Sequence, residues 1–473
     1  FIGAGISTQD IPFTYNSNWN GPGRWAIEVV TRKSKYYLKP MEKLFEQSLG
    51  SISVNEFEEI MTGTMDLPST LKIIQKICSY YPVSLASILI DQKDYSDSVH
   101  IMRREESESS SRIFSRADAS NKRTPYYEYR DTAMTKLSPF KPEWIKELRY
   151  VEDSNPENPN VAYNKGHFLH QMTAFIGPVN FYWEVNGKKY CKEMNTGDSN
   201  YITPFWKHSF ASRSKTEEAI IIAVTFSGNV ARARNELYSL GKEKIDPFVL
   251  DTKLPNKALT QLIIQILDNH NLTKLSLENL AKKQGLSLNV GMILDQNTEK
   301  LPEDLMTLAQ ILQIPNHVLS IPEYTETDEV IVKSSQSNDG YYYSSEIYPD
   351  YLIKPLAKNI RMPFMHGFNI EVVSDEEKVS GTLKTSLHSF IYNYGKSTIN
   401  FKWLTKEEWS EDVILPGDSI YIEPFTKHKF WDKTKTGKIF YYRVAGSINL
   451  EVQKELSFFA DKERIIESEQ WFN

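Results

Sequence analysis

Histidine and glutamine stand close together in one segment of this 473-residue sequence. Residues 164–178 read NKGHFLHQMTAFIGP, which places His167 and Gln171 four residues apart. On a strand with a local irregularity, two such side chains can turn to the same side and bind one metal ion. Two interpretations of Gln171 stay open: a metal ligand, or a side chain that only hydrogen-bonds beside the site. His170 competes locally with His167, and we expect it to support the site from behind or to face outward.

A third histidine belongs to a motif that occurs twice. Residues 196–210 read TGDSNYITPFWKHSF and contain His208. Residues 416–430 read PGDSIYIEPFTKHKF and contain His428 at the same place, 220 residues later. Because a long internal repeat marks a repeated structural unit, the chain is expected to contain this unit twice.

A helical pattern is repeated as well. Leu67-Pro68 and Leu301-Pro302 each begin an apolar stripe, which indicates a helix with proline in its first turn. We therefore expect a tandem duplication of a helical module followed by a β-rich module. The expected units are a helical module at 1–95, a β-rich module at 96–235, a helical module at 236–324 and a β-rich module at 325–473.

Two segments of these units have distinct patterns. Residues 275–294 read LSLENLAKKQGLSLNVGMIL, a helix-turn-helix pattern with Ser276 as a helix cap and Gly285 in the turn. The second helix, expected after Ser287, carries no Lys or Arg, which argues against a DNA-binding regulator because such a helix needs cations for phosphates. Residues 104–123 are polar and Ser-rich, and they predict either a plain surface linker or a mobile lid.

Strand patterns dominate the β-rich modules. Runs such as TAFIGPVNFYWEV, AIIIAVTFS and KIFYYRVAG indicate an antiparallel sandwich or barrel. The GD turn, the Pro step and the following His resemble the second metal-binding motif of a cupin, a small double-sheet jelly roll. This resemblance implies that His208 lies beside His167 and Gln171. Two His and one oxygen donor on one face of an octahedron form the arrangement of non-haem Fe(II) sites, which leaves positions for substrate and O₂.

The second β-rich module keeps only part of this donor set. His428 is retained, but Thr385 and Ser389 stand where the first two ligands are expected. His388 precedes Ser389 by one residue, so strand alternation turns it to the other face. We therefore expect the second cupin to be degenerate and structural, and the first to bind iron alone.

Further motifs extend the resemblance over nearly the whole chain. YYEY at 126–129 and N-x-G-H at 164–167, with a helical module before each cupin, resemble the phosphonate-processing mononuclear iron oxygenases. This family includes hydroxypropylphosphonic acid epoxidase, hydroxyethylphosphonate dioxygenase and methylphosphonate synthase. Epoxidase members have a Glu ligand four residues after the first His, and dioxygenase members use a Glu six residues before the last His. Here these positions are Gln171 and Ile202, and a His, Gln, His triad is expected of the methylphosphonate-forming members.

The resemblance also implies a reaction. It implies an Fe(II)-dependent cleavage of the C–C bond of 2-hydroxyethylphosphonate by O₂, without 2-oxoglutarate, giving methylphosphonate and CO₂ or bicarbonate. The alternative outcome of the same family is hydroxymethylphosphonate and formate.

Substrate contacts are implied at several positions. Asn164 and Tyr129 match groups that bind the phosphonate, and Lys39 matches a lysine that reaches over the active site, so Lys39 and Tyr129 are the catalytic candidates. Lys33 and Lys35 are rivals for the lysine role. The structural alternatives are a buried strand tyrosine for Tyr129 and a solvated helix lysine for Lys39. The family's Arg before YYEY has no clean match, since Asn121 stands at its spacing while Lys122 and Arg123 lie close by.

The composition of the chain argues against several other classes of protein. Lys plus Arg total 55 and Asp plus Glu 61, and the net charge of −6 argues against a nucleic-acid or anionic membrane partner. Two cysteines, Cys78 and Cys191, exclude a disulfide scaffold and a Cys-rich zinc site. No apolar run is long enough for a membrane span. We expect a cytoplasmic enzyme with a small-molecule substrate, which could form a homo-oligomer. A metal-free bicupin binding protein is the remaining alternative.

Overall fold

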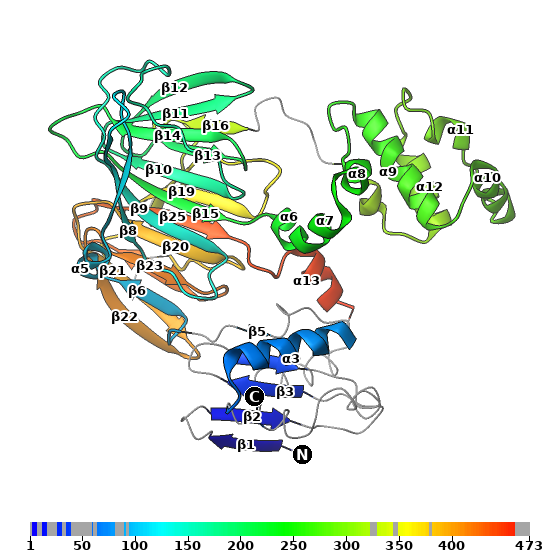
Figure 1. Ribbon diagram of the computed structural model, residues 1–473, viewed down its shortest axis with the longest axis horizontal. Helices are drawn as coiled ribbons and strands as arrows, with labels where there is room; N and C mark the ends of the chain where they lie inside the picture. Colours follow the sequence, from blue (N-terminus) through cyan, green and yellow to red (C-terminus); the bar gives the residue numbers. More distant parts are fainter. Residues whose placement is uncertain are drawn as a thin grey trace.

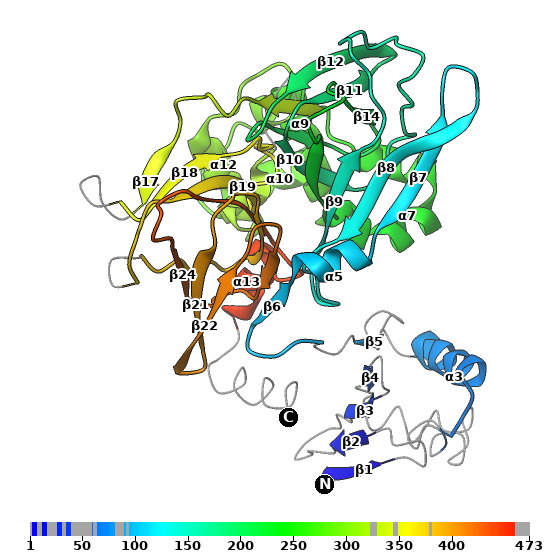
Figure 2. The ribbon, with the colours of Figure 1, turned by 90° about the vertical axis from the view of Figure 1, so that its left-hand side faces the viewer.

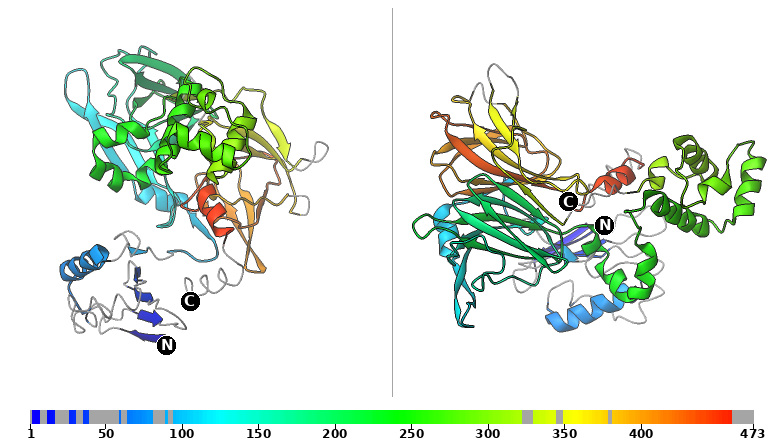
Figure 3. Two further views of the ribbon diagram at one scale, coloured as in Figure 1. Left: turned by 90° about the vertical axis from the view of Figure 1, so that its right-hand side faces the viewer. Right: turned by 90° about the horizontal axis from the view of Figure 1, so that it is seen from above.

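The structure, a computed structural model, describes residues 2–6, 12–16, 26–30, 35–38, 59, 64–80, 89–90, 94–321, 329–343, 349–377 and 381–458. Within these residues the protein is mainly β, with several antiparallel sheets and some helices (Figure 1). Two β halves lie side by side, and a group of helices lies to one side of them (Figures 1 and 3). In the part of the chain that is described, no helix is both long and apolar enough to cross a membrane.

The first β half pairs a seven-stranded sheet, in the order β16-β13-β10-β15-β9-β8-β7, with a three-stranded sheet, β12-β11-β14. Alternation along the strands explains why the two sheets pack together. On β10, Phe175 faces the core that both sheets share, whereas Met172 and Ala174 face the other half. The strands are β7 Arg112–Ala117, β8 Arg123–Asp131, β9 Phe140–Glu147, β10 His170–Ile176, β11 Val179–Val185, β12 Lys188–Met194, β13 Ser199–Ile202, β14 Lys207–Ser212, β15 Ile220–Phe226 and β16 Val330–Lys333.

The second β half is built in the same way. Its larger sheet has the order β17-β18-β19-β25-β20-β23-β6, and its smaller sheet has the order β22-β21-β24. The strands are β6 Val99–Met102, β17 Tyr341–Tyr343, β18 Tyr351–Pro355, β19 Met365–Val372, β20 His388–Asn393, β21 Ile399–Thr405, β22 Glu408–Ile414, β23 Ser419–Ile422, β24 His428–Trp431 and β25 Gly437–Val444.

The two halves exchange strands. β6, which the sequence places at the start of the first β-rich module, pairs with β23 of the second half. Figure 2 shows β6 on the side of the second half, near β21 and β22. β16, at the start of the second module, pairs with β13 of the first half. The spatial units therefore differ from the sequence boundaries at 96 and 325, because each half lends its first strand to the sheet of the other.

The aspartates of the repeated GDS motif hold the exchanged segments. Asp198 Oδ1 accepts a hydrogen bond from the Ser335 backbone N–H at 2.7 Å. At the equivalent place, Asp418 Oδ1 accepts one from the Arg104 backbone N–H at 2.9 Å. Both aspartates are buried. Each therefore satisfies a main-chain donor that the strand exchange brings to the boundary between the two halves, which we call the seam.

The serines of the motif act in the same way. Ser199 Oγ accepts a hydrogen bond from the Ala357 N–H, and Ser419 Oγ accepts one from the Ala133 N–H, each at 2.8 Å. The shared frame of the two repeats is therefore largely a means of joining the halves.

An apolar core fills the seam between the halves. Trp144, Met172 and Tyr201 of the first half pack with Phe390 and Tyr442 of the second. Each large apolar side chain buried in this way contributes roughly 1.5–3 kcal/mol, so the seam is a major source of stability.

Helices lie before the two halves, after β6, between the halves and after the last strand. Those described are α3 Leu67–Tyr80, α5 Arg104–Ser109, α6 Asn229–Arg232, α7 Arg234–Leu240, α8 Lys242–Ile245, η2 Asp246–Phe248, α9 Pro255–Asn269, α10 Lys274–Lys283, α11 Val290–Ile293, α12 Pro302–Leu312, η3 Asn316–Leu319 and α13 Leu450–Leu456. Helices α9 to α12 share one apolar core.

The helix-turn-helix pattern differs in detail from its prediction. The cap of α10 is Thr273, whose side chain accepts a hydrogen bond from the Ser276 N–H, so Ser276 lies inside the helix. Gly285 lies in the turn with a φ of 69°, where the absence of a Cβ avoids strain. The next helix, α11, is only four residues long and begins after its cap, Asn289.

Two predicted segments have other structures. Within residues 1–95, helix α3 is accompanied by a five-stranded antiparallel sheet, where a helical module alone was expected. Its strands are β1 Ile2–Ile6, β2 Pro12–Asn16, β3 Ala26–Val30, β4 Lys35–Leu38 and β5 Leu89–Ile90. Runs of β-branched and aromatic residues in β3 and β4 explain the sheet. Residues 104–123, expected to be a linker or a lid, form α5 and the hairpin of β7 and β8 instead.

Candidate metal centre

The structure brings the three predicted ligands together at one end of the first half. His167 lies in the loop before β10, Gln171 is the second residue of β10, and His208 is the second residue of β14. The His167 and His208 rings are nearly perpendicular, with centroids 5.1 Å apart. Gln171 Oε1 lies 3.2 Å from His167 Nε2. The donors therefore come from both sheets and converge over the core that the sheets share.

Backbone carbonyls orient both imidazoles. His167 Nδ1 donates to Leu169 O at 2.8 Å, and His208 Nδ1 donates to Trp206 O at 2.9 Å. With the proton on Nδ1, Nε2 of each ring carries a free lone pair, which is the form that binds a metal ion.

The Gln171 amide is oriented as a ligand would be. Its Nε2 donates to Thr173 Oγ1 at 2.9 Å, which leaves Oε1 facing His167 Nε2. Two acceptor atoms 3.2 Å apart repel each other unless a cation lies between them. Adjacent ligands about 2.1 Å from a divalent transition metal are about 3 Å apart, so the spacing fits a shared metal ion.

A local irregularity places His167 and Gln171 on the same side. Gly166 has a φ of +75°, and a Cβ there would lie 2.3 Å from Phe205 O. Only glycine fits this close approach. The turn is closed by Asn164 Oδ1, which accepts hydrogen bonds from the N–H groups of Gly166 and His208, each at 2.9 Å. The N-x-G-H pattern is thus a structural requirement of the loop.

Asn164 also reaches the donor atoms. Its Nδ2 donates to His208 Nε2 at 2.9 Å, the nitrogen that a metal ion would take. Since the Oδ1 atom holds the loop, the Nδ2 group is the part of this side chain that is available to an anion beside the metal.

Burial keeps His208 in its neutral form. The side chain is 4% exposed, and burial, with smaller effects from His167 and from the Arg116 charge, lowers the pKa of His208 to about 3. No proton has to leave this ring at neutral pH before a metal binds.

The two residues expected beside the site lie as follows. Ile202 is paired directly with Gln171 across β10 and β13 and is fully buried, so it presents an apolar wall without a donor atom. His170 points to the opposite face of β10, toward the seam. Its Nδ1 is hydrogen-bonded to the Tyr201 hydroxyl at 2.9 Å, and its ring stacks on Phe226.

Tyr129 lies in the apolar interior of the first half. Its ring contacts Phe114 and Tyr127 edge to face, and burial raises the pKa of its phenol, so the hydroxyl stays protonated. Among the described residues the hydroxyl has no hydrogen-bond partner, and it is therefore available to a ligand.

The structure points to a cation that sequence spacing missed. Asn121, at the spacing of the family arginine, lies in the β7–β8 turn with a φ of 61°. Arg116 on β7 is an arginine that faces the interior. Its guanidinium lies 5.2 Å from the centre of the Tyr127 ring, its Nη1 donates to Ala162 O, and its charge acts on His208 and Tyr129. Hairpin pairing, which the linear spacing ignored, is the signal that could have found it.

The lysine predictions cannot be placed. Lys39 and Lys33 lie outside the described residues, and of Lys35 only the backbone, at the start of β4, is described.

The equivalent place in the second half is closed by protein groups. His428 is fully buried, and its Nε2 lies 2.9 Å from the Tyr441 hydroxyl. The same hydroxyl lies 3.2 Å from Ser389 Oγ. Thr385 and Ser389 bring hydroxyl groups and no strong metal donor. His388 points to the seam and bonds the Tyr421 hydroxyl, as His170 bonds Tyr201 in the first half.

Two imidazoles and an amide oxygen that converge in one half of a mainly β chain define the class of proteins that can hold a single transition-metal ion. No family model matches the chain. Methylphosphonate synthase of Nitrosopumilus maritimus (strain SCM1) is 36% identical over 431 residues, which cover 89% of this chain and 90% of that protein. The chain belongs to the methylphosphonate synthase family.

Solved structures share its fold. Streptomyces albus HEPD, a 2-hydroxyethylphosphonate dioxygenase with its substrate and Fe(II) bound, is similar with a TM-score of 0.76 and 29% identity, over 88% of this chain and 91% of that one. PhpD with cadmium is similar with a TM-score of 0.65 and 14% identity, over 90% and 94% of the two chains, and supports the fold alone.

Proposed function

We propose that this protein is an Fe(II)-dependent oxygenase that converts 2-hydroxyethylphosphonate and O₂ into methylphosphonate, CO₂ and water. The hydroxymethyl carbon leaves as CO₂, the phosphorus-bound carbon becomes a methyl group, and the substrate supplies all four electrons that O₂ takes up. No 2-oxoglutarate is needed. The observation that carries the proposal is the His167, Gln171, His208 donor set in a chain of the methylphosphonate synthase family.

The ligand set explains why a phosphonate suits this site. His167 and His208 bind as neutral imidazoles and Gln171 binds as a neutral amide, so the protein ligands bring no negative charge. The bound iron would supply the site at which substrate and O₂ meet. A phosphonate dianion is then attracted by the metal without repulsion from a carboxylate ligand, and Ile202 provides no carboxylate from the neighbouring strand.

Other side chains of this chain bind the dianion. Asn164 Nδ2 is the nearest neutral donor, because it already lies beside the ligand nitrogen of His208. Arg116 and Tyr129 face the same interior, and we assign Arg116 the role that spacing had suggested for Asn121. Lys39 is proposed to reach over the bound phosphonate. Charge-assisted hydrogen bonds from such groups are the strong ones in a partly dry site.

The two β halves have different roles in this proposal. We infer that the chain contains a duplicated cupin, that the first cupin holds the iron, and that the second is structural. The similar strand orders of the two halves and the closed surroundings of His428 support this inference.

The test is a single-turnover reaction followed by phosphorus NMR. The chain is loaded with Fe(II) without oxygen, and 2-hydroxyethylphosphonate and O₂ are then added. Methylphosphonate is the expected product. The similarity to the dioxygenase favours the second candidate outcome, hydroxymethylphosphonate with formate, and its appearance would replace the first. His208→Ala should abolish turnover, with His428→Ala, the same change in the other repeat, as the matched control.

A further inference from the structure

A polar cavity lies between the two halves, away from the metal centre. Its volume is about 420 Å³, and both halves line it. Ile176, on its wall, ends β10 five residues after Gln171, which corresponds to roughly 16 Å along a strand. None of the proposed ligands lines the cavity. The lining residues that matter here are Arg104, Arg130, Trp144, Glu218, Tyr392 and Lys396.

One guanidinium of the cavity is held firmly. Arg130 lies over the Trp144 ring at 4.1 Å, its Nε donates to Glu128 at 2.7 Å, and its Nη1 donates to Glu108 at 3.3 Å. Its side chain is 21% exposed. An arginine fixed on three sides presents its remaining amino group in one direction and loses little entropy when it binds a ligand.

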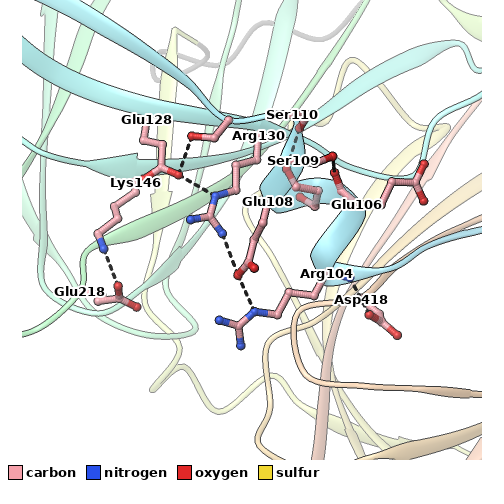
Figure 4. Close-up of polar contacts among 12 residues, drawn as sticks. Arg104, Glu106, Glu108, Ser109, Ser110, Glu128, Arg130, Lys146, Glu218 and Asp418 are labelled. Atoms are coloured by element: carbon pink, nitrogen blue, oxygen red, sulfur yellow. Dashed lines mark hydrogen bonds and ion pairs between the residues drawn. The ribbon is translucent and has the colours of Figure 1, made fainter.

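The second guanidinium is attached to the first. Arg104 Nε donates to Glu108 at 2.8 Å, so one carboxylate lies between the two arginines (Figure 4). Among the described residues, both terminal amino groups of Arg104, Nη2 of Arg130 and the ammonium group of Lys396 have no hydrogen-bond partner. The carboxylate that lines the cavity, Glu218, is already paired with Lys146. In the cavity lining, the cationic side chains Arg104, Arg130 and Lys396 therefore outnumber the one carboxylate, Glu218.

The cavity also contains a neutral donor. Tyr392 is buried, and burial raises the pKa of its phenol to about 12, although the charges of Arg104 and Arg130 act against this rise. The hydroxyl keeps its proton at neutral pH.

Arg104 packs against a GD turn on only one side of the duplicated structure. Gly417, in the second GD turn, has a φ of +92°, and a Cβ there would lie 2.9 Å from Arg104 Cδ. At the equivalent Gly197 the nearest side chains are Asn369 and Ser335, which are uncharged. The same turn thus supports a cation at one end of the seam only, so the cationic cavity does not follow from the duplication itself.

We propose that this cavity binds a small tetrahedral dianion, a phosphate or phosphonate, through Arg104, Arg130 and Lys396. Guanidinium groups match the oxygens of such anions, and the lysine adds a compact charge. A bound dianion would join α5 and β8 of the first half to the turns of the second. The proposal is independent of the iron chemistry, because it uses none of the residues of the metal centre.

The test is calorimetric titration of the full chain with inorganic phosphate at constant ionic strength. Arg104→Ala should raise the Kd about tenfold or more, the loss expected for a hydrogen bond between charged groups. Lys396→Ala, which breaks no contact, should raise it in the same direction. Glu218→Gln should lower it, because this change removes the carboxylate of the lining.

Controls separate this cavity from other sites. Arg112→Ala, which removes an ion pair with Asp131 near α5 but lines no part of the cavity, should leave the Kd unchanged. His208→Ala should also leave it unchanged. A second titration with methylphosphonate, made in His208→Ala so that the metal centre does not contribute, identifies the source, since the tighter ligand of the two is the physiological class. Equal Kd values for the wild type and Arg104→Ala, or loss of phosphate binding in His208→Ala, would overturn the proposal.

Discussion

Gln171 is the residue on which the proposed chemistry can be tested most sharply. The Oε1 atom lies 3.2 Å from His167 Nε2, and the amide is held by Thr173. Gln171→Ala removes one of three protein ligands and should remove most of the iron. Thr173→Val leaves the ligand but frees the amide to rotate, and the iron Kd should rise about 10–100-fold, the effect of losing a group that orients a ligand.

Gln171→Glu separates metal binding from turnover. A carboxylate in place of the amide should bind iron more tightly, because a charged oxygen replaces a neutral one. The same charge acts on the phosphonate. At ~5 Å and an effective dielectric constant of about 20, each pair of unit charges repels by about 3 kcal/mol. We therefore expect substrate affinity to fall by roughly 100-fold or more while iron content is kept.

The assay measures iron and product on the same samples. Iron is determined after anaerobic loading and desalting, its Kd is measured by chelator competition, and product is followed by phosphorus NMR. The reasoning fails if Gln171→Ala retains full iron and full activity, since Gln171 would then only hydrogen-bond beside the site. It fails as well if Gln171→Glu turns over like the wild type.

Four further outcomes are expected. His208→Ala should abolish iron binding while His428→Ala leaves about one iron per chain, and two irons in the wild type would contradict a single site. Arg116→Ala should raise the KM for the phosphonate about tenfold or more with iron content unchanged, whereas an altered iron content with normal KM would remove its assigned role. Lys39→Ala should weaken substrate use with iron retained, and unchanged kinetics would move this role to another lysine. Burial lowers the pKa of His428 to about 4, below its unfolded value of about 6.5, so the stability that it contributes is present above pH 6.5 and is lost as the pH falls toward 4. The free energy of unfolding in urea should fall by about 2–3 kcal/mol for this group between pH 7 and 4.5, and by less in His428→Phe.

The parts of the site that could be predicted from sequence are those set by short-range spacing. His167 lies in the loop before β10 and Gln171 lies on β10 itself, and Gly166 marks the turn that brings the two side chains to the same side. His208 could be added because its motif occurs twice. Arg116 could not be found by counting back from YYEY, because the hairpin contains a register shift between Phe114 and Ser115 that spacing does not reveal.

The parts of the fold that could not be predicted are long-range pairings. Strand periodicity indicates that residues 99–102 and 330–333 form strands, but it holds no information on which sheet receives them. The exchange is specified by hydrogen bonds to buried aspartates and serines more than 100 residues away in the chain. The polar composition of 104–123 pointed to a loop because the charged side chains of this segment form ion pairs at the surface, one within α5 and one between β7 and β8.

The repeated motif and the metal ligands are required for different reasons. Asp198 and Asp418 take equivalent hydrogen bonds at the two ends of the seam, so the GDS frame is needed in both halves whether or not a metal is present. Gln171 and His167 have no repeated partner, and in the second half the Tyr441 hydroxyl occupies the lone pair of His428 instead. A repeat that includes a histidine is therefore evidence for how the halves join. His208 becomes evidence for the iron site only together with His167 and Gln171, which the second half does not repeat.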